Sequence, residues 1–395
     1  MQMEQIRKIN SVEELTEVLH SGDEFKLYGA GHYLTVFLNG IAELEKSNQE
    51  NYLDKISCIM VSDIKANSEK IGGVSVLDYR EAGIKPGDYV LLTLGHRFTH
   101  EVYELLKGTK AVLIQIDFNL FQQIPYQEVL KSLQPFIDKY PNSCLNLNVP
   151  ESAAKTTAWT CWWQGEKTAP DIVKACFQSQ RRNLPEGVEH IIITKENYRD
   201  YIVLPEYVIA KVKTGNISLA TLSDMIRAAL LYKYGGFWLD STLFVLNRLD
   251  SEILNYPIYT RSIPETQFCT KTVWAGWFMY AKPGNKLFRF LEESFFYYFS
   301  VYDKLKYYLM IDYIIAIACN IFPEIEEQMR AVPINNEKAL ELCKHLAETF
   351  DENQYKRYIE GASVQKLTYK TSEVSSKGLK NTIYDFLIAK GEAGC

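Results

Sequence analysis

The residues best suited to chemistry lie in two neighbouring runs of the sequence, 223–227 (SDMIR) and 234–242 (YGGFWLDST). Asp224 and Arg227 are three positions apart, so on a helix they would face the same side. Asp240 follows a short apolar segment, and the carboxyl end of a strand is where open α/β sheets hold their ligands. A guanidinium between two carboxylates can bind both the anionic groups and the hydroxyls of a ligand. We therefore expect these three side chains to meet in one site.

A helix and a strand must position these residues, and the sequence contains signals for both. Apolar residues recur at helical spacing over 218–234, and Ser218 is a suitable N-cap. Gly235 and Gly236 end the helix and permit a sharp turn into a strand at 237–239. The expected order is helix, glycine turn and strand, with the first two candidate residues on the helix and the third after the strand.

The alternation of strands and helices along the chain predicts an α/β protein in two parts. In the first part we expect strands at 25–28, 56–61, 90–94 and 111–116 and helices at 11–20, 32–46 and 96–107. In the second part we expect strands at 157–163 and 190–194 and a helix at 171–182. Since strands that alternate with helices form parallel sheets, residues 1–150 should form an N-terminal helix and a small Rossmann-like module. Turn-forming residues near 145–155 separate it from a second domain over 151–395.

The candidate run has a pattern that is found in a known family, S-D-x-x-R-x-x-x-L-x-x-x-G-G-x-W-x-D-x-T. It resembles the bacterial capsular-polysaccharide-synthesis glycosyltransferases, which are relatives of the glycosyltransferases whose sugar-binding region contains a DxD motif. Three further segments agree in order, WWQG at 162–165, MYAKPGN at 279–285 and QKLTYK at 365–370. The resemblance covers 155–372, over half of the chain, and the ordered set makes it specific.

The resemblance implies a GT-A fold, an α/β sandwich that binds nucleotide sugars, for the second domain. It implies that Trp163 stacks on the donor nucleobase, and Gln164 of the same segment is counted with the donor site. Asp224 and Arg227 match the pair that holds the hydroxyls of the donor sugar and orients the phosphates. Asp240 matches the first Asp of the DxD motif, near the ribose and the metal. The implied activity is transfer of a hexose from a nucleotide-diphosphate sugar to a surface polysaccharide acceptor, with retention, because most relatives are retaining.

One position departs from the family pattern, since the second Asp of the DxD motif is Thr242. Trp238 takes the place of an aromatic residue beside the motif. A hydroxyl is a poorer ligand for Mg²⁺ or Mn²⁺ than a carboxylate, because these hard cations prefer charged oxygen. Asp240 and Thr242 remain the candidate ligands for Mn²⁺ or Mg²⁺, with the diphosphate and water completing the coordination. Lys366 and Lys370 are the alternative groups that would neutralise the departing diphosphate.

Three further expectations concern residues outside this motif. Asp312 is the candidate general base for an inverting route, which requires a carboxylate near the acceptor hydroxyl. Adjacent residues on a strand face opposite ways, so one of Trp162 and Trp163 should lie in the core. The aromatic and basic run 295–313 is expected to form a buried pair of helices, and the alternative is an element that meets a membrane surface or the acceptor.

The composition limits the partners and the compartment. The 395 residues include 43 Lys and Arg and 49 Asp and Glu, a net charge of −6, whereas nucleic-acid-binding domains usually have a basic excess. No stretch resembles a signal peptide or approaches the length of a membrane span. Eight scattered cysteines without a C-x-x-C pattern suit a reducing compartment. We expect a cytoplasmic protein that contacts at most the inner face of the membrane. Its expected partners are a nucleotide-diphosphate sugar and a saccharide acceptor, including a lipid-linked one, with no nucleic acid.

Two other functions stay open at this point. Gly29-Ala30-Gly31 follows a predicted strand and opens a helix, as a dinucleotide-binding loop does, which would suit an NAD(P)-dependent oxidoreductase or epimerase. However, Leu34 stands where the third glycine of G-x-G-x-x-G is required, and Asp63 lies too far along the chain for the usual acidic residue. The favoured interpretation is that the N-terminal module serves for docking or is a degenerate nucleotide-binding domain. The remaining alternative is a non-catalytic assembly protein that keeps the GT-A fold without the full DxD motif.

Overall fold

The computed structural model divides the chain into two compact units, Met1–Glu128 (unit 1) and Val129–Cys395 (unit 2). The division lies inside helix α4 (Leu120–Ile137), before the position near 150 at which the sequence analysis placed the domain boundary. That predicted position falls at a segment, 141–154, outside the described residues. The structure describes residues 6–22, 24–95, 98–140, 155–264, 269–271, 273–370 and 380–392.

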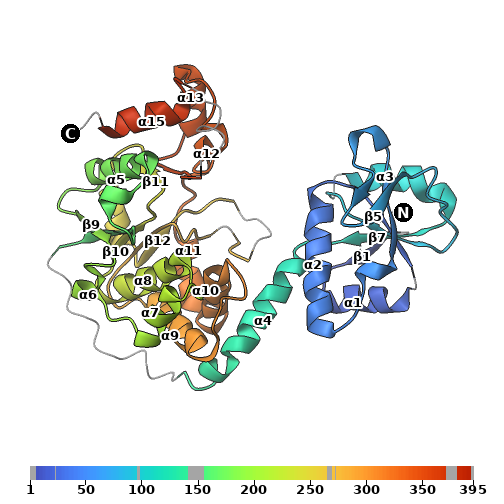
Figure 1. Ribbon diagram of the computed structural model, residues 1–395, viewed down its shortest axis with the longest axis horizontal. Helices are drawn as coiled ribbons and strands as arrows, with labels where there is room; N and C mark the ends of the chain where they lie inside the picture. The colour runs from blue at the N-terminus through green and yellow to red at the C-terminus, as the bar shows by residue number, and fades with distance from the viewer. Residues whose placement is uncertain are drawn as a thin grey trace. The chain divides into compact units, whose positions relative to one another are not determined.

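Unit 1 is built on a seven-stranded sheet in the order β1-β7-β6-β2-β3-β5-β4, of which only the short β4 is antiparallel to its neighbour (Figure 1). The order from β5 to β7 is that of doubly wound dinucleotide-binding folds, with the switch point between β2 and β6, and β1, the first strand of the chain, is added beyond β7. The strands are β1 (Ile6–Ile9), β2 (Phe25–Tyr28), β3 (Ile56–Val61), β4 (Lys70–Ile71), β5 (Val74–Asp78), β6 (Tyr89–Leu92) and β7 (Val112–Ile116), and the helices before α4 are α1 (Val12–Ser21), α2 (His32–Asn48) and α3 (Thr99–Leu106).

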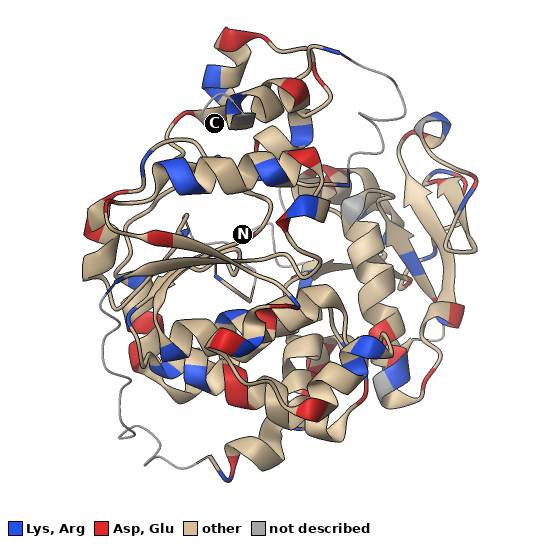
Figure 2. Cartoon of the chain, turned by 60° about the vertical axis from the view of Figure 1, so that its left-hand side comes forward, with Lys and Arg blue, Asp and Glu red and all other residues tan. Residues whose placement is uncertain are grey.

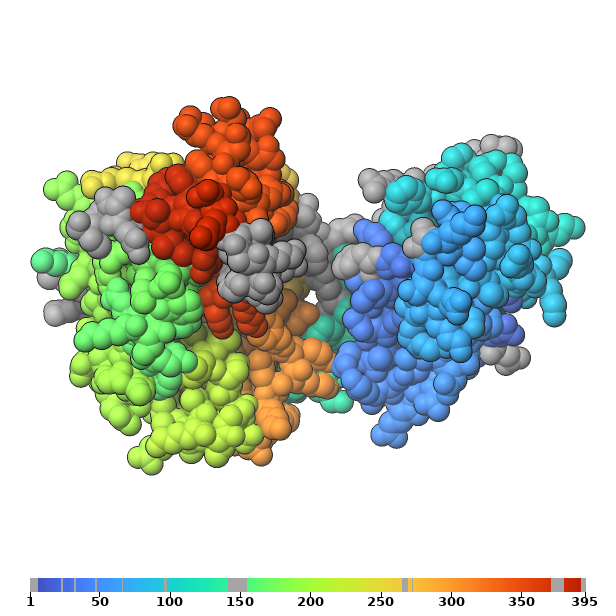
Figure 3. Space-filling view, turned by 45° about the horizontal axis from the view of Figure 1, so that its top comes forward, coloured from blue at the N-terminus to red at the C-terminus, as the bar shows by residue number. Residues whose placement is uncertain are grey.

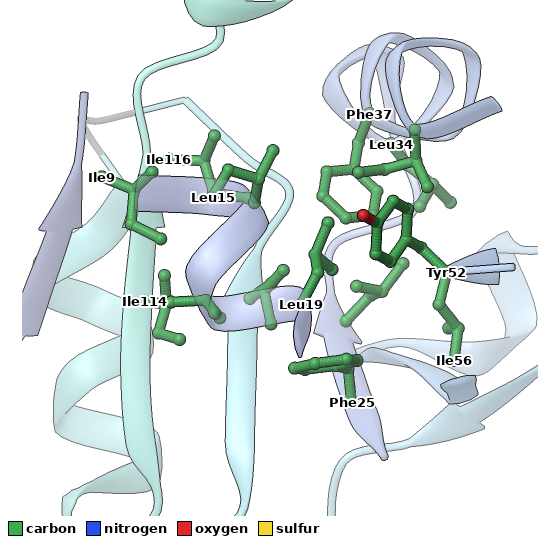
Figure 4. Packing of buried hydrophobic residues seen from close by; sticks show 14 of the residues in the cluster. Ile9, Leu15, Leu19, Phe25, Leu34, Phe37, Tyr52, Ile56, Ile114 and Ile116 are labelled. Atoms are coloured by element: carbon green, nitrogen blue, oxygen red, sulfur yellow. The ribbon is translucent and has the colours of Figure 1, made fainter. Parts of the chain in front are cut away.

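Local signals explain why these elements form. Ser11 caps α1 by accepting a hydrogen bond from the Glu14 N–H at 3.2 Å, and the Glu14 carboxylate accepts from the N–H of Asn10 at 2.8 Å. Figure 4 shows the apolar face of α1 turned toward the sheet, where Leu15 and Leu19 pack with strand residues. Each such side chain contributes about 1.5–3 kcal/mol on burial, so the core and not the cap dominates the stability of this unit.

Unit 2 contains a five-stranded sheet in the order β12-β13-β10-β8-β9. Strands β8, β9 and β10 run parallel, and β12 and β13 are antiparallel additions. A separate antiparallel pair, β11 with β14, joins residues more than a hundred positions apart. The strands are β8 (Thr157–Cys161), β9 (Glu189–Ile193), β10 (Gly236–Leu239), β11 (Leu243–Val245), β12 (Ile258–Thr260), β13 (Phe278–Ala281) and β14 (Val364–Lys366).

Helices cover both faces of this sheet (Figure 1). α8 packs on β8, β10 and β13, and α5 packs on β9 and on β11. α15 lies on α5, and Figure 3 shows the red C-terminal residues against green residues of unit 2. The helices are α5 (Asp171–Asn183), α6 (Tyr198–Tyr201), α7 (Glu206–Lys213), α8 (Leu219–Lys233), α9 (Lys286–Val301), α10 (Met310–Ile321), α11 (Pro323–Arg330), α12 (Leu342–His345), α13 (Glu352–Ile359) and α15 (Ile383–Glu392).

The second half of α4 packs within unit 2. The ring of Phe136 stacks near Tyr297 of α9, with centroids 5.5 Å apart, and contacts Phe290 at 5.8 Å. Tyr140 meets Phe290 edge to face at 5.4 Å and also meets Phe322. This aromatic cluster ties the segment after Glu128 to α9 and explains why the division of the chain precedes position 150.

The sequence predicts the fold class and most of the elements that surround the motif. The expected α/β class is confirmed, since a Rossmann-like parallel sheet is followed by a second α/β domain whose arrangement is consistent with the GT-A kind, and the helix 218–234 is present as α8, capped by Ser218. Strands β1 and β5 and helix α4 were not predicted. The predicted helix 96–107 begins at Thr99, and its first two residues lie outside the described residues.

The run 295–313 forms parts of two helices, as predicted, but the segment between them, including Tyr302 and Tyr308, is exposed and not buried. Phe295 and Phe299 of α9 are fully buried, and Ile311 of α10 is buried as well. Figure 2 shows charges of both signs spread over the helices of the chain, while the strands are largely free of them. No helix among the described residues combines the length and the apolar character that crossing a membrane would require.

The glycine turn after α8 provides a test of the fold. Gly236 has φ +89°, and a Cβ there would stand 2.0 Å from the carbonyl oxygen of Thr157 in the neighbouring strand. Gly187 has φ +79°, but a Cβ there meets nothing within 4 Å.

We expect Gly236→Ala to lower the free energy of unfolding by about 3 kcal/mol or more, and Gly187→Ala by about 1 kcal/mol. Urea denaturation followed by tryptophan fluorescence measures this, since all six tryptophans lie in unit 2. Equal losses in the two variants would contradict the close approach of the strands.

Candidate functional site

The candidate residues gather at one edge of the unit 2 sheet. β8 and β10 are parallel neighbours, so the residues after Cys161 and after Leu239 leave the sheet at the same edge. The backbone N–H of Asp240 donates to the carbonyl oxygen of Trp277 at 3.0 Å, which brings the segment before β13 to this edge as well. The segments after β8, after β10 and before β13 therefore meet at this edge.

Arg227 is the centre of the site. Its guanidinium contacts the carboxylates of Asp224 at 3.1 Å and Asp240 at 3.2 Å and lies over the Trp238 ring, 4.9 Å from the centroid. Arg227 is only 5% exposed, and a Cβ at position 276 would stand 2.9 Å from its Nη1, so a side chain there would have to displace the guanidinium. The predicted convergence of Asp224, Arg227 and Asp240 is present in the structure.

Lys366 joins the same cluster from the far end of the chain. Its Nζ donates to Asp240 Oδ2 at 2.7 Å and to Thr242 Oγ1 at 2.6 Å. The register of the β11–β14 pair sets Lys366 opposite Leu243, directly after Thr242, and the Leu367 N–H donates to the Thr242 carbonyl at 2.8 Å. Backbone pairing thus holds the lysine at the two positions that correspond to the DxD motif.

A buried amide fixes the turn that carries Asp240. Gln180 of α5 has no exposed surface, and its Nε2 donates to the carbonyl oxygens of Asp240 at 2.9 Å and Leu243 at 2.8 Å. Its Oε1 accepts from the hydroxyl of Thr160 at 3.0 Å. The sequence analysis missed Gln180. The signal that could have revealed it is an amide four residues after Cys176, on the apolar face of a helix.

The cluster shifts the pKa values of its carboxyl groups in opposite directions. Burial alone would raise the pKa of Asp240, but the charges of Lys366 and Arg227 and the hydrogen bonds from Lys366 and Trp238 outweigh it and hold the pKa below the ordinary value. Burial raises the pKa of Asp224 to about 7, although Arg227 opposes this, and the charge of Asp240 adds to it. Asp240 is therefore an anion at neutral pH, whereas Asp224 is protonated in part of the molecules and ionised in the rest.

Asp312 lies on the same side of the unit, at the start of α10. Its Oδ1 accepts a hydrogen bond from Trp274 Nε1 at 3.0 Å, and its charge acts on Asp224. Burial raises the pKa of Asp312, while the Trp274 hydrogen bond and Arg227 oppose the rise. The sequence analysis missed Trp274, and no spacing signal connects it to the motif.

The two neighbouring tryptophans make different contacts, but β8 ends at Cys161, before both of them, and both are half-buried, so strand alternation does not place one of them in the core as expected. Trp162 packs against the core between α5 and α15, with its ring edge-on to Tyr369 at 5.6 Å. Trp163 lies at the sheet edge, and its ring is 5.1 Å from that of Tyr198. Its position leaves it as the candidate for stacking on a ligand.

Two of the predicted donor-binding residues stay apart from the cluster. Gln164 and Lys370 are exposed, and among the described contacts neither is linked to Asp240. Their roles remain predictions.

The residues present do not fit a divalent cation held by Asp240 and Thr242 together. Both carboxylate oxygens of Asp240 already accept hydrogen bonds, Oδ1 from Arg227 and Trp238 and Oδ2 from Lys366. Thr242 Oγ1 accepts from the same ammonium. Within the described part of the chain, no three His, Cys, Asp or Glu side chains stand close enough to hold a metal ion. The donors around Asp240 are those of a site that neutralises charge with side-chain cations.

The arrangement can bind a ligand that carries both phosphates and hydroxyls. Arg227 and Lys366 supply two positive charges, while Asp224 and Asp240 can accept hydrogen bonds from sugar hydroxyls. Burial raises the pKa of the nearby Cys161 thiol to about 12, although a hydrogen bond with Ser223 opposes this. That thiol is protonated at neutral pH and supplies no nucleophile. The chemistry on offer is binding and charge stabilisation.

Comparison with known proteins agrees with the pattern of the motif. Residues 113–387 match the family described as "Capsular polysaccharide synthesis protein". The matched region covers more than half of the chain and includes every residue of the cluster. A search of curated proteins finds no match to this chain. The family that the sequence motifs resemble is therefore confirmed.

The raised pKa of Asp224 makes the stability depend on pH. Between the ordinary value of 3.8 and the folded-state value of about 7, the folded protein holds a proton on Asp224 that the unfolded chain has released. The stabilisation from this proton is complete below the unfolded pKa and is lost as pH rises through the folded pKa. We expect the wild type to lose unfolding free energy relative to Asp224→Asn from pH 5 to pH 8, in urea denaturation with tryptophan fluorescence. Parallel pH curves for the two proteins would show that the pKa of Asp224 is ordinary.

Proposed function

The chain belongs to the family of capsular polysaccharide synthesis proteins, and we propose that it is a glycosyltransferase. In this proposal it moves a hexose from a nucleotide-diphosphate sugar to a saccharide acceptor of the capsule or a related surface polysaccharide. The observation that carries the proposal is the linked cluster of Asp224, Arg227, Asp240 and Lys366. It combines two fixed cations with carboxylates that can accept from hydroxyls, as a donor with a charged diphosphate and a sugar requires.

Each part of the donor has a suitable group in the site. Lys366 and Arg227 face the negative charge of the diphosphate, and Asp224 accepts hydrogen bonds from the sugar hydroxyls. Trp163 is half-buried at the same sheet edge, and a nucleobase could stack on the part of its ring that is exposed. The anionic Asp240 holds both cations in place and accepts from a ribose or sugar hydroxyl.

The reaction needs positioning and charge stabilisation more than acid–base chemistry. The bond between the anomeric carbon and the phosphate oxygen breaks, its electron pair leaves with the diphosphate, and the acceptor hydroxyl oxygen forms the new bond. The cations of the cluster stabilise the charge that develops on the diphosphate. In the retaining route that we propose, the acceptor proton passes to the departing phosphate oxygen. Asp312 is the base of the alternative inverting route, and the anomeric configuration of the product by NMR separates the two.

Removing the charge of Asp240 tests the proposal. A panel of uridine-, guanosine- and thymidine-diphosphate sugars is screened for thermal stabilisation and for slow hydrolysis. Hydrolysis is informative because a working transferase slowly passes the donor sugar to water when no acceptor is present. We expect one donor to be hydrolysed by the wild type and its hydrolysis to fall at least about 100-fold in Asp240→Asn. Asp171→Asn, which removes an exposed charge at the start of α5, is the matched control and keeps the wild-type rate.

The same screen decides among the alternatives. A donor that binds but is never hydrolysed would favour the non-catalytic assembly protein. Binding of NAD(P) with no response to any nucleotide sugar would favour the oxidoreductase or epimerase, for which the doubly wound strand order of unit 1 is the supporting observation. Either result would overturn the proposed transferase.

The proposed stacking of the nucleobase makes a separate prediction. Trp163→Ala should raise the donor KM about tenfold or more with a smaller change in kcat, because stacking on an aromatic side chain contributes about 1–3 kcal/mol per base. Trp163→Phe keeps an aromatic face and is expected to retain most of the affinity. Steady-state kinetics of donor hydrolysis measure both variants. A KM that is unchanged in Trp163→Ala would place the base elsewhere.

A further inference from the structure

The Lys366 ammonium stands where the DxD motif would hold a metal ion. We infer that Lys366 takes the place of the divalent cation at the donor diphosphate, so that sugar transfer proceeds without metal. The inference rests on the proposed function, and it concerns how that function is achieved. It starts from two contacts, because the Nζ of Lys366 bridges Asp240 Oδ2 at 2.7 Å and Thr242 Oγ1 at 2.6 Å.

The geometry leaves the ammonium one donor for a ligand. An ammonium has three N–H groups, and within the described part of the chain its recorded acceptors are the oxygens of Asp240 and Thr242. The third N–H remains for an oxygen of the diphosphate. Lys366 is the last residue of β14, and its pairing with Leu243 fixes the backbone from which the side chain extends. The cation is thus held in advance of the donor.

Electrostatics disfavours a second cation at this place. Typical bond lengths for Mg²⁺ or Mn²⁺ to oxygen are about 2.1 Å, so an ion on Asp240 Oδ2 would lie within about 5 Å of the ammonium. The guanidinium of Arg227 approaches the other oxygen of the same carboxylate. The anionic carboxylate of Asp240 is then shared by two cations, Arg227 and Lys366. These two charges would repel a divalent metal ion as a third cation.

The substitution of Thr for Asp is consistent with this assignment. A carboxylate at position 242 would supply a second negative charge and favour a dication. The hydroxyl of Thr242 instead accepts a hydrogen bond from Lys366 and adds no charge. Arg227 and Lys366 then supply two positive charges beside the diphosphate, of which the anionic Asp240 offsets one.

In the reaction the ammonium keeps its proton throughout. The third N–H of Lys366 donates to a phosphate oxygen, and the bond shortens as that oxygen takes the electron pair of the breaking anomeric bond. This is the role that a metal has as a Lewis acid, performed by a charge-assisted hydrogen bond. Lys366 is therefore a catalytic residue by contact with the leaving group.

Metal binding and activity are measured separately. Electron paramagnetic resonance of Mn²⁺ alone reports binding without any donor, in the wild type, in Lys366→Ala and in the double variant Thr242→Asp/Lys366→Ala, which restores the D-x-D arrangement without the ammonium. We expect no binding by the wild type at millimolar Mn²⁺, measurable binding by Lys366→Ala and the tightest binding by the double variant. Lys344→Ala removes an exposed lysine paired with Glu341 and should behave as the wild type.

The activity arm uses donor hydrolysis in EDTA and in Mn²⁺. The wild type should hydrolyse its donor equally in both, Lys366→Ala should lose about 100-fold or more in EDTA, and Mn²⁺ should restore part of that loss. A wild type that requires Mn²⁺, or that binds Mn²⁺ as tightly as Lys366→Ala does, overturns the inference while the transferase stands. If no nucleotide sugar is bound or hydrolysed in either condition, the proposed function fails, and the resonance measurement still decides which cation the site prefers. The two wild-type measurements need no variant to fold.

Discussion

The buried charge of Arg227 is the constraint on which the rest of unit 2 depends. Removing a cation from water costs several kcal/mol, and the protein recovers this only where opposite charges and hydrogen bonds replace the water. Here Asp224 and Asp240 supply the opposite charge, and the face of Trp238 covers one side. The requirement that Asp240 meet Arg227 sets the position of the turn after β10, and with it the place of every group that bonds to Asp240.

That turn is held from three directions, so the cluster is rigid before any ligand arrives. The amide of Gln180 binds two of its carbonyl groups, the β11–β14 pair continues from it, and the Trp277 carbonyl accepts from its first N–H. None of these supports carries a charge. The supports are neutral backbone and amide groups, while the charged side chains meet in the site. This division suits electrostatic catalysis, which requires dipoles and charges that do not reorganise during the reaction.

Local sequence signals predict the half of the site that lies within one helix–turn–strand unit. Asp224, Arg227 and Asp240 are related by helical spacing and a glycine turn, so their meeting follows from geometry along the chain. Lys366 was placed in the site by family resemblance alone, since its position depends on a strand register with residues more than a hundred positions away. Gln180 and Trp274 were missed for the same reason, because their contacts are tertiary. In unit 1 the sequence did not predict the edge strand β1, because β1 has only four residues and two of them are exposed.

The course of α4 has a consequence for dissecting the protein. Residues from Val129 onward belong to unit 2, and Val129 and Leu133 are almost completely buried. A fragment that began at position 150 would lack these side chains and would also uncover the rings of α9 that Phe136 and Tyr140 cover. Such a fragment would expose this aromatic surface to other molecules and would tend to aggregate, even if the cluster around Arg227 stayed intact. The smallest fragment that carries the cluster and folds on its own therefore starts within α4, near Val129. It does not start near position 150, where the turn-forming residues suggested a linker.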